Sequence, residues 1–155
     1  MTETTTQTPT FRLPDPCEWQ IAESYVSVAN TCGYRLMARP ALALAFVPLS
    51  EAPLHAFPVD LQQSIVANRC AVWCYVAAIT AAPSIARTLS LCDDDEAWQL
   101  LRANIGLLRA PTTDIRLFVG AAALARAGSL VDGPSRDRAV RLYDRLTRVS
   151  EGLSR

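Results

Sequence analysis

The sequence predicts an all-α fold, a compact array of five or six helices with an apolar, proline-rich segment between the first two long helices. Three observations predict it. Apolar residues recur at helical spacing in several segments of the chain. These segments tend to follow a capping residue, a proline or a cluster of carboxylates, which are common helix starts. No segment shows the clear apolar–polar alternation that is typical of a half-buried strand.

The chain has 155 residues, half of them apolar, and this length fits one domain. We assign residues 1–14 to a disordered N-terminal tail and residues 15–155 to a single helical domain. Threonine, glutamine and proline dominate the tail, in which Phe11 and Leu13 stand out as large apolar residues. Those two side chains are suited to dock on the domain or on a partner.

Asp15 and Pro16 open the first predicted helix. Asp15 suits the N-cap, Pro16 suits the first turn, and Glu18 completes a capping box. We expect the helix to end near Arg39, because Pro40 restricts the residue before it. Its predicted core face is Ile21, Tyr25, Val28, Cys32 and Leu36.

The segment from Pro40 to Pro58 contains four prolines among apolar residues. Its run from Leu42 to Val47 fits either a short strand or a helical turn, because periodicity does not decide for so short a run. The apolar content indicates that the segment packs on the body of the protein. Long irregular segments in compact domains are uncommon and often functional.

The second helix is predicted from about Asp60 to Ala82. Apolar residues lie nearly all round it, so we interpret it as the central helix. We expect Pro83 and Ser84 to break it, with a short helix following to Leu91. One face carries small residues that would let another helix approach closely: Ala67, Ala71, Cys74, Ala78 and Ala81.

Three more helices are predicted in the rest of the chain. The acidic residues 93–96 open one that ends near Arg109, because carboxylates stabilise the first turn of a helix. The next runs from Asp114 to Ala127, with Gly128 as its C-cap. The last runs from about Ser135 to Gly152.

The charge and the cysteines limit the class of protein. The formal net charge is zero, so no overall field attracts the chain to nucleic acid or to an anionic membrane. All 15 basic residues are arginine, which indicates either a GC-rich genome or selection against lysine. The five cysteines match no disulfide framework, and the N-terminus lacks the features of a secretory signal. We therefore expect free thiols and a cytoplasmic location.

We also expect no membrane span. The longest uncharged run, from Cys70 to Ala86, is shorter than the roughly 20 residues that cross a bilayer, and Pro83 interrupts it. A buried core helix explains this run better.

The last predicted helix carries the clearest pattern. An apolar stripe runs along it: Ala139, Leu142, Tyr143, Leu146, Val149 and Leu153. This stripe either packs within the domain or forms part of a homodimer interface. An arginine stripe lies beside it: Arg138, Arg141, Arg145 and Arg148.

The arginine stripe suits an acidic protein surface, because the planar guanidinium binds a carboxylate through two hydrogen bonds. Interleaved acids dilute the field and no aromatic residue lies on that face of the helix for base stacking, so we do not expect nucleic acid there. The alternative is a solvated face, with Asp137 paired to Arg141 and Asp144 to Arg148 one turn along.

A second candidate site is a pocket between helices for an apolar ligand. Its predicted lining is Tyr25, Phe46, Phe57, Asn68, Arg69, Trp73 and Trp98. Asn68 and Arg69 interrupt an apolar helix, and Arg69 lies one turn before Trp73, where its guanidinium would reach the indole. The alternative for Asn68 is a structural hydrogen bond at a helix end.

The sequence predicts no catalytic residue, no metal site and no cofactor. Cys70 and Cys74 lie one turn apart, but zinc needs about four ligands and no paired CxxC motif is present. Core packing explains these cysteines better. His55, the single histidine, lies among prolines without an acid to orient it. Phosphate-binding glycine loops, nucleophile elbows and HExxH motifs are also missing from the sequence.

These observations favour a protein–protein interaction module, such as an adaptor, regulator, inhibitor or chaperone-like protein. It would act through the arginine-striped C-terminal helix and the proline-rich apolar segment. One alternative is a helical binder of a small apolar ligand or cofactor. Another is a small enzyme with a cysteine or carboxylate nucleophile, although we expect a non-enzyme.

Overall fold

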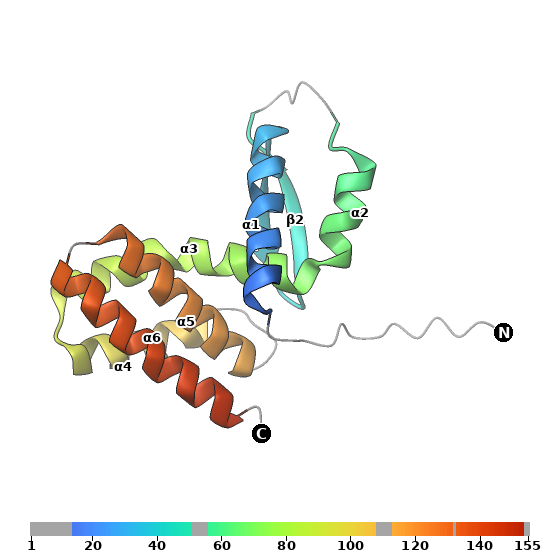
Figure 1. The fold of residues 1–155 in the computed structure, drawn as a ribbon. Helices are drawn as coiled ribbons and strands as arrows, with labels where there is room; N and C mark the ends of the chain where they lie inside the picture. Colours follow the sequence, from blue (N-terminus) through green and yellow to red (C-terminus); the bar gives the residue numbers. More distant parts are fainter. Residues whose placement is uncertain (1–13, 51–55, 108–112, 132, 154–155) are drawn as a thin grey trace.

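The computed structural model describes residues 14–50, 56–107, 113–131 and 133–153. In this part of the chain six helices and one two-stranded antiparallel sheet follow in the order α1–β1–β2–α2–α3–α4–α5–α6 (Figure 1). The predicted helical character is confirmed, but the strand hairpin is a difference from the all-α prediction. The predicted tail lies outside the described residues, apart from Pro14.

Helix α1 spans Pro16–Thr31 and has the predicted capping box. The Asp15 carboxylate accepts a hydrogen bond from the Glu18 backbone N–H at 2.8 Å, and the Glu18 carboxylate accepts one from the Asp15 backbone N–H at 3.4 Å. The predicted end near Arg39 is wrong. Gly33 has a φ of +87° and ends the helix, because this left-handed conformation suits glycine.

The core face of α1 also differs from the prediction. Small side chains, Ala22, Val26 and Ala29, are buried, whereas Ile21 and Val28 are exposed. The helix therefore packs closely on its neighbours through alanine and leaves two larger apolar side chains in solvent.

A β-hairpin takes the place of the predicted end of the first helix. Strand β1, Tyr34–Arg39, pairs antiparallel with β2, Ala43–Pro48. The turn places Ala41 and Leu42 at positive φ, 62° and 57°, which is uncommon for residues other than glycine and asparagine. Burial of the Leu42 side chain, 1% exposed, offsets this strain. Of the two alternatives for the run from Leu42 to Val47, the strand is correct. Leu42 lies in the turn, and Ala43 to Val47 belong to β2.

The predicted second helix is two helices. Helix α2 spans Val59–Ala67 and α3 spans Arg69–Leu91, with a break at Asn68. The expected break at Pro83 is wrong, because α3 continues through this proline. Pro83 is exposed, whereas Ala82, Ile85 and Leu89 beside it are buried in the core. Tertiary packing on both sides of the proline keeps the helix continuous.

Helix α3 is the central helix, as predicted. It contacts α1, both strands and the other helices. By length and composition it is the one helix of the described residues that is long and apolar enough to cross a membrane, and 56% of its most apolar window is buried inside the fold. Such burial is expected of a core helix.

The chain ends in α4, Asp94–Leu107, α5, Thr113–Leu130, and α6, Gly133–Leu153. Gly128 is not the predicted C-cap but a residue inside α5. A Cβ atom there would lie 3.2 Å from the Cβ of Ala139 on α6. The missing side chain lets α5 and α6 pack closely, and this pair forms the front of the lower part of Figure 1.

Two clusters of buried residues form the core. The larger one lies among α3, α4, α5 and α6 and includes Leu124 and Leu146. The second lies among α1, the hairpin, α2 and the first half of α3 and includes Ile65 and Val72. The side chain of Trp19 packs against both clusters. It therefore marks the junction between the two parts of the fold.

Candidate functional site

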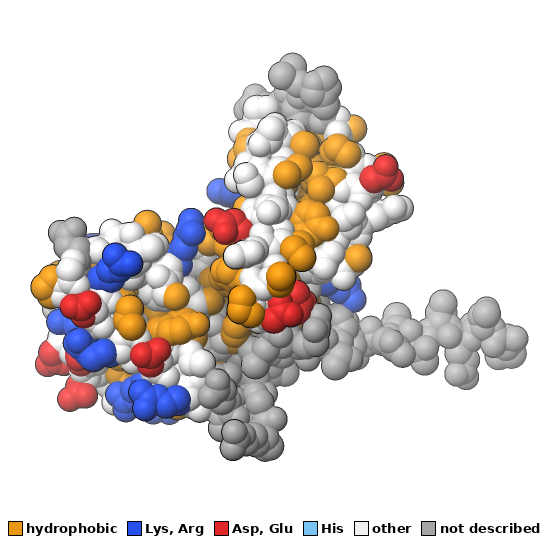
Figure 2. Space-filling model, viewed as in Figure 1, with side chains coloured by type: hydrophobic (Ala, Val, Ile, Leu, Met, Phe, Trp, Pro, Cys, Tyr) orange, Lys and Arg blue, Asp and Glu red, His pale blue; other side chains and the backbone are white. Residues whose placement is uncertain are grey.

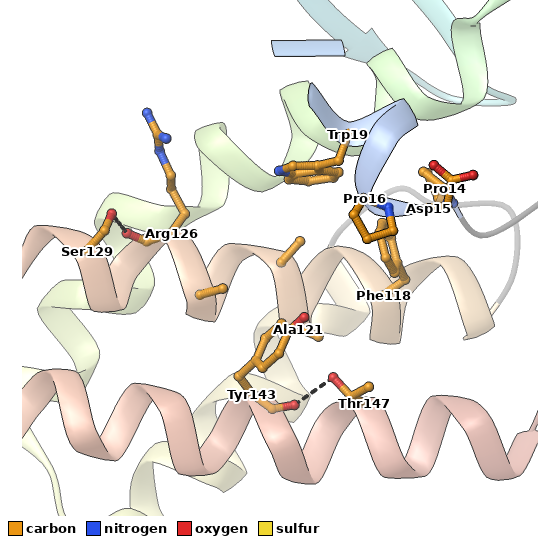
Figure 3. Close-up of a pocket in the computed structure, with 12 residues that line it drawn as sticks. Pro14, Asp15, Pro16, Trp19, Phe118, Ala121, Arg126, Ser129, Tyr143 and Thr147 are labelled. Carbon is orange, nitrogen blue, oxygen red and sulfur yellow. Dashed lines mark hydrogen bonds between the residues drawn. The ribbon is translucent and has the colours of Figure 1, made fainter. Parts of the chain in front are cut away.

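A cleft of about 720 Å³ opens at this junction, between the start of α1 and the outer faces of α5 and α6 (Figure 3). We call it the Trp19 cleft. Its lining comprises Pro14, Asp15, Pro16 and Trp19 from the start of α1, Phe118, Ala121, Ala122, Ala125, Arg126 and Ser129 from α5, and Tyr143 and Thr147 from α6. In the space-filling view, apolar side chains gather along the junction, whereas charged side chains gather over the lower part of the molecule (Figure 2).

Ring contacts fix the aromatic wall of the cleft. The Trp19 ring meets Tyr75 of α3 edge-on, with centroids 5.1 Å apart. It meets Phe118 of α5 in the same way, with centroids 5.8 Å apart and an angle of 81°. Edge-to-face geometry is favoured between aromatic rings. Two such contacts from different helices hold the Trp19 side chain in one orientation.

Alanine forms the floor of the cleft. Ala121, Ala122 and Ala125 of α5 line the cleft, and Ala121 lies beneath Trp19 in Figure 3. Methyl groups leave space that longer side chains would fill. The alanine-rich sequence of α5 thus permits both the close contact with α6 and the cleft above it.

The polar groups of the cleft lie at its edges. The Ser129 hydroxyl donates to the Arg126 carbonyl at 2.6 Å, and the Thr147 hydroxyl donates to the Tyr143 carbonyl at 2.9 Å. Both hydroxyls therefore donate to a carbonyl of their own helix.

Burial raises the pKa of Tyr75, which lies behind Trp19. The positive charge of Arg126 lowers this pKa, and the negative charge of Glu23 raises it. The Arg126 guanidinium is exposed.

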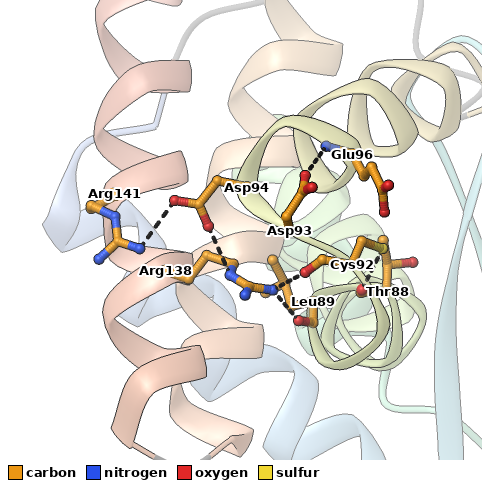
Figure 4. A network of polar contacts seen from close by, with 8 residues as sticks. All are labelled: Thr88, Leu89, Cys92, Asp93, Asp94, Glu96, Arg138 and Arg141. Carbon is orange, nitrogen blue, oxygen red and sulfur yellow. Dashed lines mark hydrogen bonds and ion pairs between the residues drawn. The ribbon is translucent and has the colours of Figure 1, made fainter.

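The arginine stripe predicted on the last helix is engaged within the chain. Arg138 Nη1 donates to the carbonyls of Leu89 and Cys92 at the end of α3, and its Nε lies 2.8 Å from the Asp94 carboxylate (Figure 4). Arg141 reaches the other oxygen of Asp94 at 3.1 Å. Arg141 therefore pairs with Asp94 of α4 and not with Asp137 of its own helix, the pairing expected for a solvated face.

The other two arginines of the stripe also contact their surroundings. The Arg145 guanidinium lies 3.9 Å from the centroid of the Trp98 ring, a cation–π contact. Arg148 Nε donates to the Asp144 carbonyl at 3.4 Å. Arg141, Arg145 and Arg148 are exposed residues, so binding of an acidic partner stays a prediction for them.

The structure places the aromatic residues of the predicted ligand pocket in two groups. Tyr25, Phe46 and Phe57 pack against the smaller core cluster, with the Phe46 and Phe57 rings 4.9 Å apart. Trp73 and Trp98 belong to the larger cluster. Trp73 Nε1 donates to the Arg39 carbonyl at 2.7 Å, which ties α3 to the hairpin. None of the predicted lining residues borders the Trp19 cleft.

Asn68 makes structural hydrogen bonds at a helix end, which was the alternative to a place in a ligand pocket. Its amide Nδ2 donates to the Ser64 carbonyl at 2.9 Å and to the Tyr25 hydroxyl at 3.5 Å. These bonds hold the break between α2 and α3 against α1. Arg69 is half-buried at the first position of α3.

The cysteines are free thiols in the described structure. Cys74 is fully buried, and a hydrogen bond with Cys70, together with burial, raises the pKa of its thiol far above the usual range. A thiol in this state is a poor nucleophile at neutral pH. Among the described residues, no group of three or more potential ligands gathers to hold a metal ion. His55 lies outside the described residues.

The acidic cluster at the start of α4 caps the helix, as predicted. The Asp93 carboxylate accepts the Glu96 backbone N–H at 2.9 Å. Asp94 has a second role that the sequence does not predict, because it pairs with Arg138 and Arg141 of α6. The Trp19 cleft is likewise not predicted by the sequence. The run of small residues after Phe118 on α5 indicates space beside this helix. The opposite wall of the cleft is Trp19, which lies far away in the sequence.

Comparison of the chain with protein-family models, with curated proteins and with solved structures finds no match.

Proposed function

We propose that the protein is a binding protein that holds the apolar part of a small ligand in the Trp19 cleft. The observation that carries the proposal is the cleft itself, about 720 Å³ of space bounded by Trp19, Phe118 and Tyr143. Small-molecule sites are concave, mostly apolar and of about 300–1,000 Å³, with few polar groups. The Trp19 cleft has these properties.

Two features of the walls support binding. Trp19 is held by edge-on contacts with Tyr75 and Phe118, so a ligand does not need to order it. Ser129 and Thr147 direct their hydroxyl hydrogens to backbone carbonyls, so an apolar group placed beside them leaves no donor unpaired. Each buried methylene of the ligand would then contribute about 0.8 kcal/mol.

A matched pair of variants tests the proposal. Ala125 is exposed at the cleft, so Ala125→Trp places a large side chain in the cleft without entering the core. Ala103 is exposed on α4, and Ala103→Trp adds the same side chain elsewhere. The probe is N-phenyl-1-naphthylamine, a neutral fluorophore that brightens in apolar surroundings.

We expect saturable binding of one probe per chain in the wild type and in Ala103→Trp. Affinity should fall at least about tenfold in Ala125→Trp, because a factor of ten needs the loss of only about 1.4 kcal/mol of contact. Unchanged melting temperatures of both variants would show that they are folded. The proposal fails when the wild type shows no saturable binding, or when both variants bind the probe equally.

One observation supports the second candidate function, docking of an acidic protein surface. Arg141, Arg145 and Arg148 are exposed along α6 despite their contacts within the chain. Charge reversal of Arg141 and Arg145 should weaken such a complex. Native mass spectrometry with a denatured control separates the two candidates. Extra mass that is lost on denaturation supports a bound ligand, whereas a clean single or multiple chain mass directs the search to protein partners.

A further inference from the structure

The Trp19 cleft has charges of opposite sign at its two ends. Arg126 and Ser129 lie at one end, Asp15 and Phe118 lie at the other, and Trp19 stands between them (Figure 3). The lining between the two charges is mostly apolar. The Ser129 and Thr147 hydroxyls are turned to backbone carbonyls, and the Tyr143 hydroxyl and the Trp19 indole N–H are its other polar groups. Arg126 is therefore the cation that the described lining offers to a ligand, and it lies at one end of the cleft.

Among the described residues, Arg126 has no ion-pair partner that would compete with a ligand. Within the described part of the chain, no carboxylate lies within ion-pair distance of the Arg126 guanidinium, and the hydrogen bond found for this residue involves its backbone carbonyl. Arg138 and Arg141 on the neighbouring helix both pair with Asp94. Asp15, at the opposite end, is held by its capping box with Glu18.

The position of Arg126 relative to the aromatic wall sets the length of the ligand. Phe118 and Arg126 lie on the same helix, eight residues apart, so about 12 Å of α5 separates them. Ala122 and Ala125 provide the floor between these two residues. An apolar tail that spans this distance would reach from Phe118 to Arg126 along the alanine floor.

We infer that the ligand of the Trp19 cleft is an amphipathic anion, with an apolar tail between Trp19 and α5 and a carboxylate or phosphate head group at Arg126. This inference rests on the proposed function and adds the chemical class and the direction of the ligand. Arginine suits both head groups, because its planar fork donates two parallel hydrogen bonds to either. The Asp15 carboxylate disfavours the reverse orientation by repulsion.

The test compares decanoate, decyl phosphate, decanol and decyltrimethylammonium as competitors of N-phenyl-1-naphthylamine, each below its micelle concentration. The variants are Arg126→Gln and Arg126→Glu, with Arg102→Gln as the control on the exposed face of α4. Arg126 is exposed, so its replacement leaves the core intact. Decyl phosphate and decanoate distinguish the two head groups.

We expect decanoate or decyl phosphate to bind the wild type more tightly than decanol does. Arg126→Gln should weaken the anion about tenfold and leave decanol unchanged, because a charge-assisted hydrogen bond is lost only with the anion. Arg126→Glu should prefer decyltrimethylammonium over decanoate. Arg102→Gln should match the wild type for all four compounds.

Two results would overturn the inference. Equal effects of Arg126→Gln on decanoate and decanol, with the neutral probe still bound, would show that the head group lies elsewhere while the cleft remains a ligand site. Failure of the wild type to bind the neutral probe and all four decyl compounds would overturn the proposed function together with the inference.

Discussion

The Nε atom of Arg138 on α6 lies 2.8 Å from the carboxylate of Asp94, the first residue of α4. The same guanidinium donates to the carbonyls of Leu89 and Cys92, where α3 ends. One side chain from the last helix therefore holds both sides of the α3–α4 corner. An arginine that looks like a docking residue in the sequence thus has a structural role.

Replacement of Arg138 by methionine should lower the free energy of unfolding by about 2 kcal/mol, because two carbonyls and a carboxylate lose their donor. Its side chain is 25% exposed, so water compensates only in part. Arg148→Met is the control, since Arg148 is exposed and should change stability by no more than about 0.5 kcal/mol. Urea unfolding measures both, and equal losses would contradict the assignment.

Alkaline pH should destabilise the protein through Cys74. Its thiol pKa is raised in the folded state from the ordinary value of 9.0, chiefly by the hydrogen bond with Cys70 and by burial. Above that pH the unfolded chain releases a proton that the folded chain keeps. The free energy of unfolding therefore falls by about 1.4 kcal/mol per pH unit for this group.

Urea unfolding at several pH values up to 10.5 measures this slope. Cys74→Ala should reduce the loss of stability with rising pH, although its stability at neutral pH is lower because a cavity forms. Cys17→Ala, at an exposed position, should keep the wild-type slope. An unchanged slope in Cys74→Ala would show that another group dominates.

Pro83→Ala should stabilise the protein by about 1–3 kcal/mol, because proline lacks the N–H of a helix interior and costs about 3 kcal/mol there relative to alanine. Position 83 is exposed, so the alanine meets no core residue. Ser84→Ala is the neighbouring control and should have a small effect. Thermal unfolding compares the variants, and a lower stability of Pro83→Ala would contradict the account of α3.

Gly128→Leu should destabilise the protein by about 1–3 kcal/mol through overpacking between α5 and α6. A Cβ atom at this position already approaches Ala139 to 3.2 Å. Gly133→Leu serves as the control, because nothing lies within 4 Å of a Cβ atom at Gly133. Similar stability of the two variants would show that the helices separate at little cost.

Local signals predicted several elements of the fold. The capping box at Asp15 and the acidic start of α4 depend on residues three apart, so the sequence displays them directly. The stripe of α6 predicted its core face, and Ala139, Leu142 and Leu146 are buried as expected. Tyr143 is half-buried and Val149 is exposed, which differs from the predicted stripe.

Other features depend on contacts that a single segment does not show. The hairpin turns at Ala41 and Leu42, which carry none of the usual turn chemistry, and burial of Leu42 supports this turn. Helix α3 passes Pro83 because the rest of the fold packs on both sides of it. The Trp19 cleft needs α1 beside α5, and no periodicity within either helix predicts that pairing.

Fluorine NMR of the protein labelled with 5-fluorotryptophan shows whether an apolar ligand binds beside Trp19. The chain has three tryptophans. Trp19 lines the cleft, whereas Trp73 and Trp98 are 2% and 8% exposed in the core. Trp19→Phe assigns the signal of Trp19. We predict that saturating decanol shifts this resonance and leaves the other two in place; a shift of Trp98 or Trp73 alone, or no shift at all, would contradict the account.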